Sequence, residues 1–150
     1  MTSDDRPVVV DMFCGSGGES QGIDWSAQRA GVDIEMYAIN NWQRAIETHQ
    51  ANFPDAEHIC RDVQDIEPAS LLPGRHVALL WASPACTHFS VARGGKPMDD
   101  QSRVTPFPER YIFTGGRADV VRQIGNAVCP KVAEALTSAY MVELAGGVGA

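Results

Sequence analysis

Apolar residues in this chain gather in short runs that alternate with segments of helical spacing. Runs rich in Val, Ile, Leu and Met predict buried strands, whereas apolar residues that recur every three or four positions predict amphipathic helices. The predicted strands cover residues 7–13, 34–39, 56–60 and 76–82. The predicted helices between the first three strands cover residues 19–31 and 40–53. Strands that alternate with helices indicate an α/β fold, in which right-handed crossovers build a mostly parallel sheet with flanking helices.

The periodic pattern is lost between residues 91 and 114, where Gly, Pro and charged residues follow no period. We expect this stretch to be irregular. Helical spacing returns near the C-terminus and predicts one amphipathic helix with Pro130 near its start. The apolar stripe of this helix is expected to contain Ile124, Val128, Val132, Ala135 and Ala139. A length of 150 residues without repeats fits a single domain over residues 1–150.

Composition narrows the classes of protein that fit. The chain is 44% hydrophobic and 21% charged, as ordinary globular domains are. No apolar stretch is long enough to span a bilayer, and the opening MTSDDRP is acidic and polar, so we expect a cytoplasmic protein with no membrane partner. The four cysteines form no CxxC pair, which favours free thiols over a zinc site.

The net charge of −7 argues against simple non-specific binding of nucleic acid. The charge is uneven, because acidic residues dominate up to Cys86 whereas Lys and Arg outnumber them over residues 87–131. A positive stretch directly after Cys86 is compatible with an anionic substrate, and equally with a solvated loop.

Candidate groups follow each of the four predicted strands. The turn FCGSGG follows the first strand, and the next three are followed by Asn41–Trp42, Asp62 and Cys86. Parallel sheets bind ligands at the carboxyl ends of their strands, so we expect these groups to converge on one edge. From its position alone, Cys86 is a core residue, a metal ligand or a nucleophile.

The glycines of the turn, Gly15, Gly17 and Gly18, permit positive φ and close backbone approach. The pattern lacks the spacing of a dinucleotide fingerprint and the Lys-Ser/Thr of a P-loop, so it is weak evidence alone. Trp42 can offer an aromatic face to a base, and Asp62 can accept a hydrogen bond from an exocyclic amine. Singly, such residues are more often a core residue and a helix cap, but together they suit an adenosine-bearing ligand without phosphates.

Four segments, DMFCGSGG (11–18), NNW (40–42), SPACTHFS (83–90) and RQIGNAV (122–128), occur in this order. They resemble the S-adenosylmethionine-dependent DNA cytosine-5 methyltransferases. The resemblance implies a partial Rossmann-like methyltransferase fold, S-adenosylmethionine as the cofactor and double-stranded DNA as the partner. It also implies DNA methylation of the restriction-modification type.

The resemblance further implies a role for each matching residue. The cofactor pocket would contain Phe13, Gly15, Gly17, Gly18, Asn41, Trp42, Asp62, Val63, Asn126 and Val128. Cys86 would be the nucleophile that attacks a cytosine flipped out of the duplex, a task that suits a thiol whose pKa already lies near neutrality. Ser90 and Arg93 would contact a DNA phosphate. His88 as a general base is a less favoured alternative.

This sequence departs from the family pattern at several places. Ala85 stands where the family has the proline before the cysteine, and Asn41 replaces the acidic residue that binds the ribose, so we expect weaker cofactor binding. The family's Glu-Asn-Val motif and target-recognition region have no counterpart in the about thirty residues between SPACTHFS and RQIGNAV, where Glu109 is the only glutamate. Loss of such a contact to the base can cost about 10²–10³ in rate.

Three interpretations therefore remain. The chain is a cytosine-5 methyltransferase, complete or completed by a partner; or a remnant that binds S-adenosylmethionine without catalysis; or an unrelated α/β nucleotide-binding module, which RQIGNAV disfavours. Without the family's later strands, the strand at 76–82 is expected to form an exposed apolar edge. We therefore expect self-association or a completing partner chain.

Overall fold

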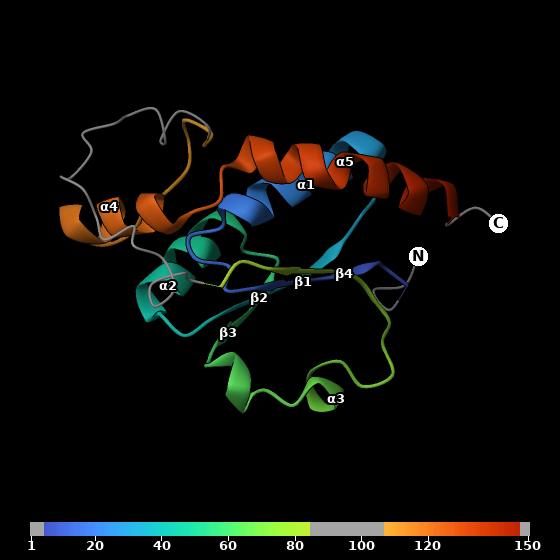
Figure 1. Cartoon of the computed structure of the whole chain (residues 1–150), viewed down its shortest axis with the longest axis horizontal. Coiled ribbons are helices and arrows are strands. Elements are labelled where there is room, and N and C mark those ends of the chain that lie inside the picture. The colour runs from blue at the N-terminus through green and yellow to red at the C-terminus, as the bar shows by residue number, and fades with distance from the viewer. Residues whose placement is uncertain (1–4, 85–106, 148–150) are drawn as a thin grey trace.

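A computed structural model describes residues 5–84 and 107–147 of the chain. Its centre is a parallel sheet with the strand order β3-β2-β1-β4 (Figure 1). The strands are β1 (Val8–Met12), β2 (Glu35–Asn40), β3 (Glu57–Cys60) and β4 (Val77–Ala82). The predicted α/β fold with a parallel sheet and flanking helices is confirmed, and its strand order is that of a partial Rossmann-like fold.

Helices lie on both sides of this sheet. In Figure 1, α1 and α5 lie above it and α3 lies below it. The helices are α1 (Gly18–Ala30), α2 (Gln43–Asn52), the 3₁₀ turn η1 (Val63–Asp65), α3 (Pro68–Leu71), α4 (Arg117–Asn126) and α5 (Pro130–Gly147). No helix in the described ranges is long and apolar enough to cross a bilayer.

The core follows from the alternation of β1. Val9 packs on one side of the sheet with Ile23, Met36 and Met141, and thus beneath α1 and α5. Val8 and Val10 pack on the other side with Ile39 and the half-buried side chains that lead to α3. A strand that is apolar on both faces is buried on both faces, which is why β1 lies inside the sheet.

The C-terminal part differs from the single helix that the sequence predicts. Two helices are present, because Ala127 has extended backbone angles and α5 starts only at Pro130. Proline at the first helical position disfavours a helical conformation for the residue before it. The apolar pattern from Ile124 to Val132 is therefore continuous in the sequence, although the helix is interrupted between α4 and α5.

The predicted apolar stripe of this helix is also wrong for α5. Val132 is 51% exposed, and Ala135 and Ala139 are exposed as well. The buried face instead carries Pro130, Ala133, Glu134, Thr137 and Met141. The small Ala133 side chain is buried where α5 packs very closely on Gly22 of α1, and Met141 is buried because it enters the apolar core over the sheet.

Gly22 is the point of closest approach between these two helices. A Cβ atom built at Gly22 would lie 2.6 Å from the Cβ atom of Ala133 and would overlap the Pro130 carbonyl oxygen. One turn further along α1, the hydroxyls of Ser26 and Thr137 lie 2.6 Å apart and form a buried hydrogen bond. The α1–α5 contact therefore depends on the absence of a side chain at Gly22 and on the hydrogen bond between Ser26 and Thr137.

Among the described residues, β4 is an edge strand that pairs only with β1. Leu80 on this strand is 57% exposed. The expectation of an exposed apolar edge is thus confirmed for the described part of the chain.

We expect Gly22→Ala to lower the free energy of unfolding by roughly 1–3 kcal/mol, because the added methyl group has no room between α1 and α5. Gly146→Ala in α5 is the control, since its surroundings are open and alanine favours the helix by up to about 1 kcal/mol. Urea denaturation measures both. Equal effects of the two substitutions would contradict a tight helix contact at Gly22.

Candidate cofactor and active site

The predicted groups lie after strands that run parallel, so they lie at the same edge of the sheet. The glycine turn follows β1, Asn41–Trp42 follows β2, and Asp62 follows β3. The three residues predicted to touch DNA or cytosine, Cys86, Ser90 and Arg93, lie outside the described residues. Their roles stay predictions.

The glycine turn is built from left-handed backbone conformations. Gly17, which precedes α1, has φ of 89°, and Gly15 has φ of 52°. Phe13 has φ of 63°, a conformation that is uncommon for a non-glycine residue and that clusters at ligand sites. The turn is held by a bond from the Cys14 amide to the Ile39 carbonyl (3.1 Å) and one from the Gly17 amide to the Cys14 carbonyl (2.8 Å).

Two of the predicted cofactor segments meet at Gly18. A Cβ atom at Gly18 would overlap the carbonyl oxygen of Val128, so the first residue of α1 contacts the backbone of RQIGNAV directly. Asn126, the last residue of α4, is exposed two residues before Val128. Residues more than a hundred positions apart in the sequence are thus neighbours at the turn.

The aromatic ring of Trp42 is already covered on one face. The guanidinium carbon of Arg122 lies 4.2 Å from the ring centroid in a cation–π contact. Trp42 itself is half-buried and precedes α2, and its amide donates to the side chain of Asn40 (2.9 Å). A base that stacks on the covered face must displace Arg122, a residue for which the sequence analysis assigned no role.

Asn41 and Asp62 are brought together by the ends of β2 and β3. The Asn41 side-chain amide donates to one Asp62 oxygen (3.3 Å), and the amide of Gln64 donates to the other (3.2 Å). Asp62 therefore caps η1, which is the more common role for an aspartate at such a position. It also lies at the carboxyl edge of the sheet, where the sequence predicts it. Val63 is half-buried and packs on the β1–β2 core instead of standing free.

Tyr111 is a site residue that the sequence analysis missed. Its hydroxyl donates to the carbonyl of Ser16 in the glycine turn. A Cβ atom at Gly17 would lie 2.6 Å from this hydroxyl and 2.8 Å from the ring of Phe53. Glycine is therefore required at position 17 both by its φ and by the rings packed against it, and no local sequence signal connects Tyr111 to this turn.

The segment from Phe107 to Thr114 has no helix or strand but is fastened to α2. Asn52 donates to the Ile112 carbonyl (2.7 Å) and accepts from the Ile112 amide (2.8 Å). The hydroxyls of Thr48 and Thr114 lie 2.8 Å apart. The irregular stretch predicted at 91–114 is thus irregular in its described part, yet held by specific hydrogen bonds.

A chain of buried polar groups runs behind the turn from β1 to β3. Ser20 donates its single hydroxyl proton to Asp11, so the Nε2–H of His49 donates to the Ser20 oxygen (2.9 Å). The Nδ1 atom of His49 then accepts from Nε2–H of His58 (2.9 Å). Burial raises the pKa of Asp11 to about 7 and lowers the pKa of His49 to about 3, so His49 is neutral.

Glu19 is a buried carboxyl in the first turn of α1, only 2% exposed. Burial raises its pKa well above the usual range, and the neighbouring Asp11 carboxyl raises it further. Among the described residues, four buried side-chain oxygens have no hydrogen-bond partner: Asp11 Oδ1, Ser16 Oγ, Glu19 Oε2 and Gln123 Oε1. Buried polar atoms without partners are costly, so these four oxygens are candidates for contact with a polar ligand.

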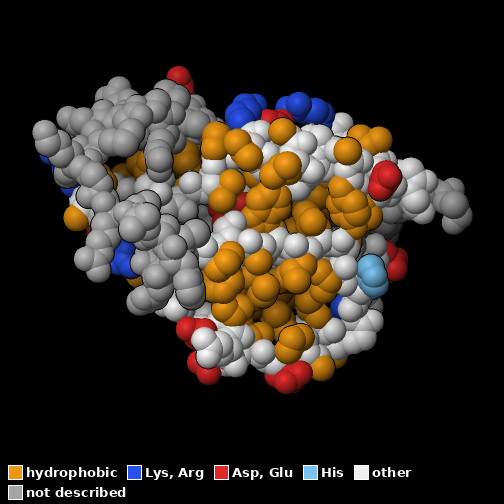
Figure 2. Space-filling view, in the orientation of Figure 1, with side chains coloured by type: hydrophobic (Ala, Val, Ile, Leu, Met, Phe, Trp, Pro, Cys, Tyr) orange, Lys and Arg blue, Asp and Glu red, His pale blue; other side chains and the backbone are white. Residues whose placement is uncertain are grey.

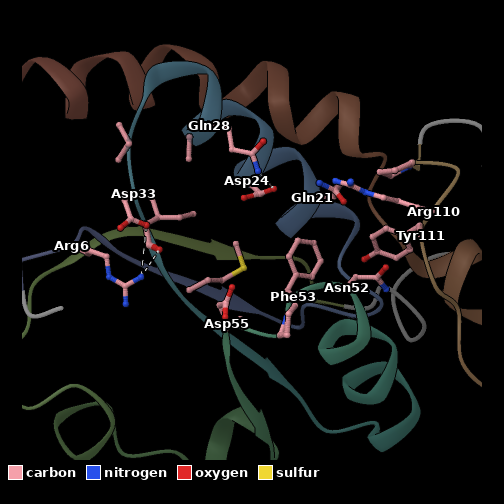
Figure 3. A pocket seen from close by; sticks show the side chains of 17 residues that line it. Arg6, Gln21, Asp24, Gln28, Asp33, Asn52, Phe53, Asp55, Arg110 and Tyr111 are labelled. Atoms are coloured by element: carbon pink, nitrogen blue, oxygen red, sulfur yellow. Dashed lines mark hydrogen bonds and ion pairs between the residues drawn. The ribbon is translucent and has the colours of Figure 1, made fainter.

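A separate groove of about 710 Å³ lies between α1 and the segment that follows α2, residues 53–56 (Figure 3). Met36 and Phe53 line it together with polar side chains that include Asp24, Asp33 and Asp55. It contains none of the predicted site residues, although Tyr111 and Phe53 connect its end to the glycine turn. No group of three metal-ligating side chains occurs within residues 5–84 and 107–147.

The family model for C-5 cytosine-specific DNA methylases matches residues 8–105 and 98–141. The chain belongs to this family. Type II methyltransferase M.HgiDI of Herpetosiphon aurantiacus is 37% identical over 85 residues, which are 56% of this chain and 26% of that protein. Type II methyltransferase M.HgiGI of the same organism is 35% identical over 84 residues, 56% of this chain and 63% of that protein.

A solved structure of a DNA modification methyltransferase encoded within an E. coli prophage shares 33% identity with this methylase-family chain. The match covers 56% of this chain and 24% of that chain, with a TM-score of 0.45. The chain thus spans from about a quarter to under two thirds of the length of the relatives that it matches.

Tyr111→Phe tests whether the Tyr111 hydroxyl holds the glycine turn. We expect faster hydrogen exchange of the amides at Gly17 and Gly18, since a lost buried hydrogen bond costs about 1 kcal/mol or more. Tyr140→Phe is the matched control, because Tyr140 donates the same kind of bond to the Ala78 carbonyl far from the turn. Unchanged exchange in Tyr111→Phe would contradict this role.

The raised pKa of Glu19 predicts a pH-dependent stability. At pH values above the usual glutamate pKa of 4.5, the unfolded chain ionises Glu19 while the folded chain holds the proton to higher pH, so unfolding releases a proton and stability falls as pH rises. We expect Glu19→Gln to reduce this slope by up to about 1.4 kcal/mol per pH unit. Urea titrations across this pH range measure the slopes, and identical slopes in both proteins would refute the assignment.

Proposed function

We propose that this chain is a DNA (cytosine-5)-methyltransferase that transfers a methyl group from S-adenosylmethionine to carbon 5 of a flipped cytosine. The observation that supports this most directly is the contact of Gly18 with Val128, which joins the glycine turn to RQIGNAV at the carboxyl end of the sheet. Family membership gives the class of reaction, and this contact supports a working cofactor pocket.

The side chains around the turn fit S-adenosylmethionine. Its amino acid end is cationic at the amine, and Asp11 and Glu19 offer buried carboxyl oxygens without protein partners. The ring of Trp42 and the carboxylate of Asp62 suit its adenine, and the turn itself has no P-loop lysine for a phosphate. When bound, the cofactor supplies an electrophilic methyl group.

In this proposal the chain's own nucleophile is Cys86. Its thiolate adds to carbon 6 of cytosine, the S–C bond forms, and the electron pair of the 5,6 double bond becomes available at carbon 5 for methylation. Loss of the carbon-5 proton to a base then restores the double bond and expels the thiolate. The target must leave the duplex to reach this sulfur, and Ser90 and Arg93 would hold a phosphate of the displaced nucleotide.

Two features of the chain favour a second candidate. The Glu-Asn-Val motif is missing from the sequence, and the chain spans 26% of M.HgiDI. A remnant that binds S-adenosylmethionine without catalysis would keep the turn and the Gly18–Val128 contact while lacking the group that activates cytosine. A chain completed by a second polypeptide, either a copy of itself or another partner, would regain that group.

Methyl transfer from labelled S-adenosylmethionine to cytosine-containing duplex DNA tests the first proposal. Label is expected in DNA with the wild-type chain and with Cys60→Ser, which removes an exposed thiol without an assigned role, and not with Cys86→Ser. Cofactor affinity is measured in parallel by calorimetry. Binding without transfer would support the remnant, and absence of both would overturn the proposal that this site holds the cofactor.

A further inference from the structure

Arg122 is a charged residue to which the reaction proposed above gives no task. It belongs to α4, which lies at the end of the molecule where the strands of the sheet end. The large groups of apolar side chains lie elsewhere, over α5 and on the side of α3 (Figure 2). The exposed Arg122 side chain contacts the ring of Trp42, and within residues 5–84 and 107–147 its guanidinium makes no hydrogen bond or ion pair.

The space between Arg122 and Trp42 has no room for a third group. The guanidinium carbon lies 4.2 Å from the ring centroid, which is the distance of a single stacking contact. A base placed between two planar groups needs about 7 Å, because each of its two contacts takes about 3.5 Å. An adenine that stacks on this face of Trp42 therefore requires one of the two side chains to move.

The backbone of Trp42 is held firmly by its neighbours. Its amide donates to the side chain of Asn40 (2.9 Å). Its carbonyl accepts from the amides of Ala45 (3.0 Å) and Ile46 (3.2 Å), because Trp42 is the residue that caps the start of α2. Moving Trp42 would disturb the first turn of this helix, so the ring is the fixed member of the pair.

The side chain of Arg122 can move without disturbing its own helix. The neighbouring Gln123 is only 1% exposed and donates to the carbonyl of Thr114 (2.8 Å), which holds α4 in place. An exposed cation–π contact contributes little, so the guanidinium loses little when it enters water. If it stayed above the adenine instead, it would lie near the positively charged sulfur and amine of S-adenosylmethionine, and like charges repel.

We propose that Arg122 is a positioning residue that covers the Trp42 ring in the free chain and is displaced when the adenine of S-adenosylmethionine stacks there. The inference rests on the proposed function, because it requires this cofactor at this site. Only molecules with an uncovered ring can bind the adenine, so the contact weakens the apparent affinity for the cofactor. Arg122 thus opposes cofactor binding, although it lies in RQIGNAV, the segment that the resemblance assigns to the cofactor pocket.

Titration calorimetry with S-adenosylhomocysteine, which lacks the positive charge on sulfur, tests the competition. Arg122→Ala is expected to lower the dissociation constant by about two- to fivefold, the factor that corresponds to one cation–π contact at an exposed site. The same factor is expected with S-adenosylmethionine. Arg117→Ala is the matched control, because Arg117 is another exposed arginine of α4, and its affinity is expected to equal that of the wild type.

The outcomes separate this inference from the proposed function. Unchanged or weaker binding by Arg122→Ala would overturn the competition. A gain confined to S-adenosylmethionine, or an equal gain in Arg117→Ala, would also overturn it, because either result would reflect charge alone. If neither the wild type nor Arg122→Ala binds either compound, the proposed cofactor site is overturned, and this inference with it.

The displacement itself can be observed by NMR of the wild-type chain with labelled arginine side chains. The Nε proton of Arg122 is assigned by its absence from the spectrum of Arg122→Ala. In the free chain this proton is expected to be shifted upfield by the ring current of Trp42, and to return toward its ordinary position when S-adenosylhomocysteine binds. An unchanged position in the saturated complex would mean that the guanidinium still covers the ring, and would overturn the proposal.

Discussion

The close contact between α1 and α5 is the constraint on which the rest of this structure depends. Glycine at positions 18 and 22 lets the backbone of α1 meet Val128 and Pro130 without a side chain between them. This contact carries the end of the chain back to the turn after β1, and so completes the candidate cofactor site. Close contact at Gly22 admits only a small side chain there, which is why Ala133 faces α1.

The site combines a rigid frame with polar groups that lack protein partners. Tyr111 and Phe53 hold the glycine turn from outside, while Asp11, Ser20 and His49 form a connected chain of hydrogen bonds behind it. Within the described part of the chain, four buried side-chain oxygens have no hydrogen-bond partner, which is costly for the folded state. Burial of Asp11 and Glu19 therefore has two effects. It raises the pKa values of both carboxyl groups, and it leaves one oxygen of each without a hydrogen-bond partner among the described residues.

The edge strand β4 is open to pairing with a further strand. The chain matches only a part of longer relatives, and within residues 5–84 and 107–147 its sheet ends at β4, whose residues are uncharged. An apolar strand with a free edge gains from further pairing, whether the additional strand comes from a copy or from another polypeptide.

Sequence alone determined the parallel α/β order, the glycine turn after β1 and the exposed apolar edge at β4, because strand runs, helical spacing and turn glycines are local patterns. It placed the groups at Asn41–Trp42 and Asp62 on one edge, but not the Arg122 guanidinium over Trp42 or the capping of η1 by Asp62. It also predicted the wrong face of α5, since Val132 looks like a core residue until the distance between α1 and α5 is known. The pairing of Tyr111 with the turn and the split before Pro130 were decided only in the tertiary structure, because each depends on contacts between segments far apart in the chain.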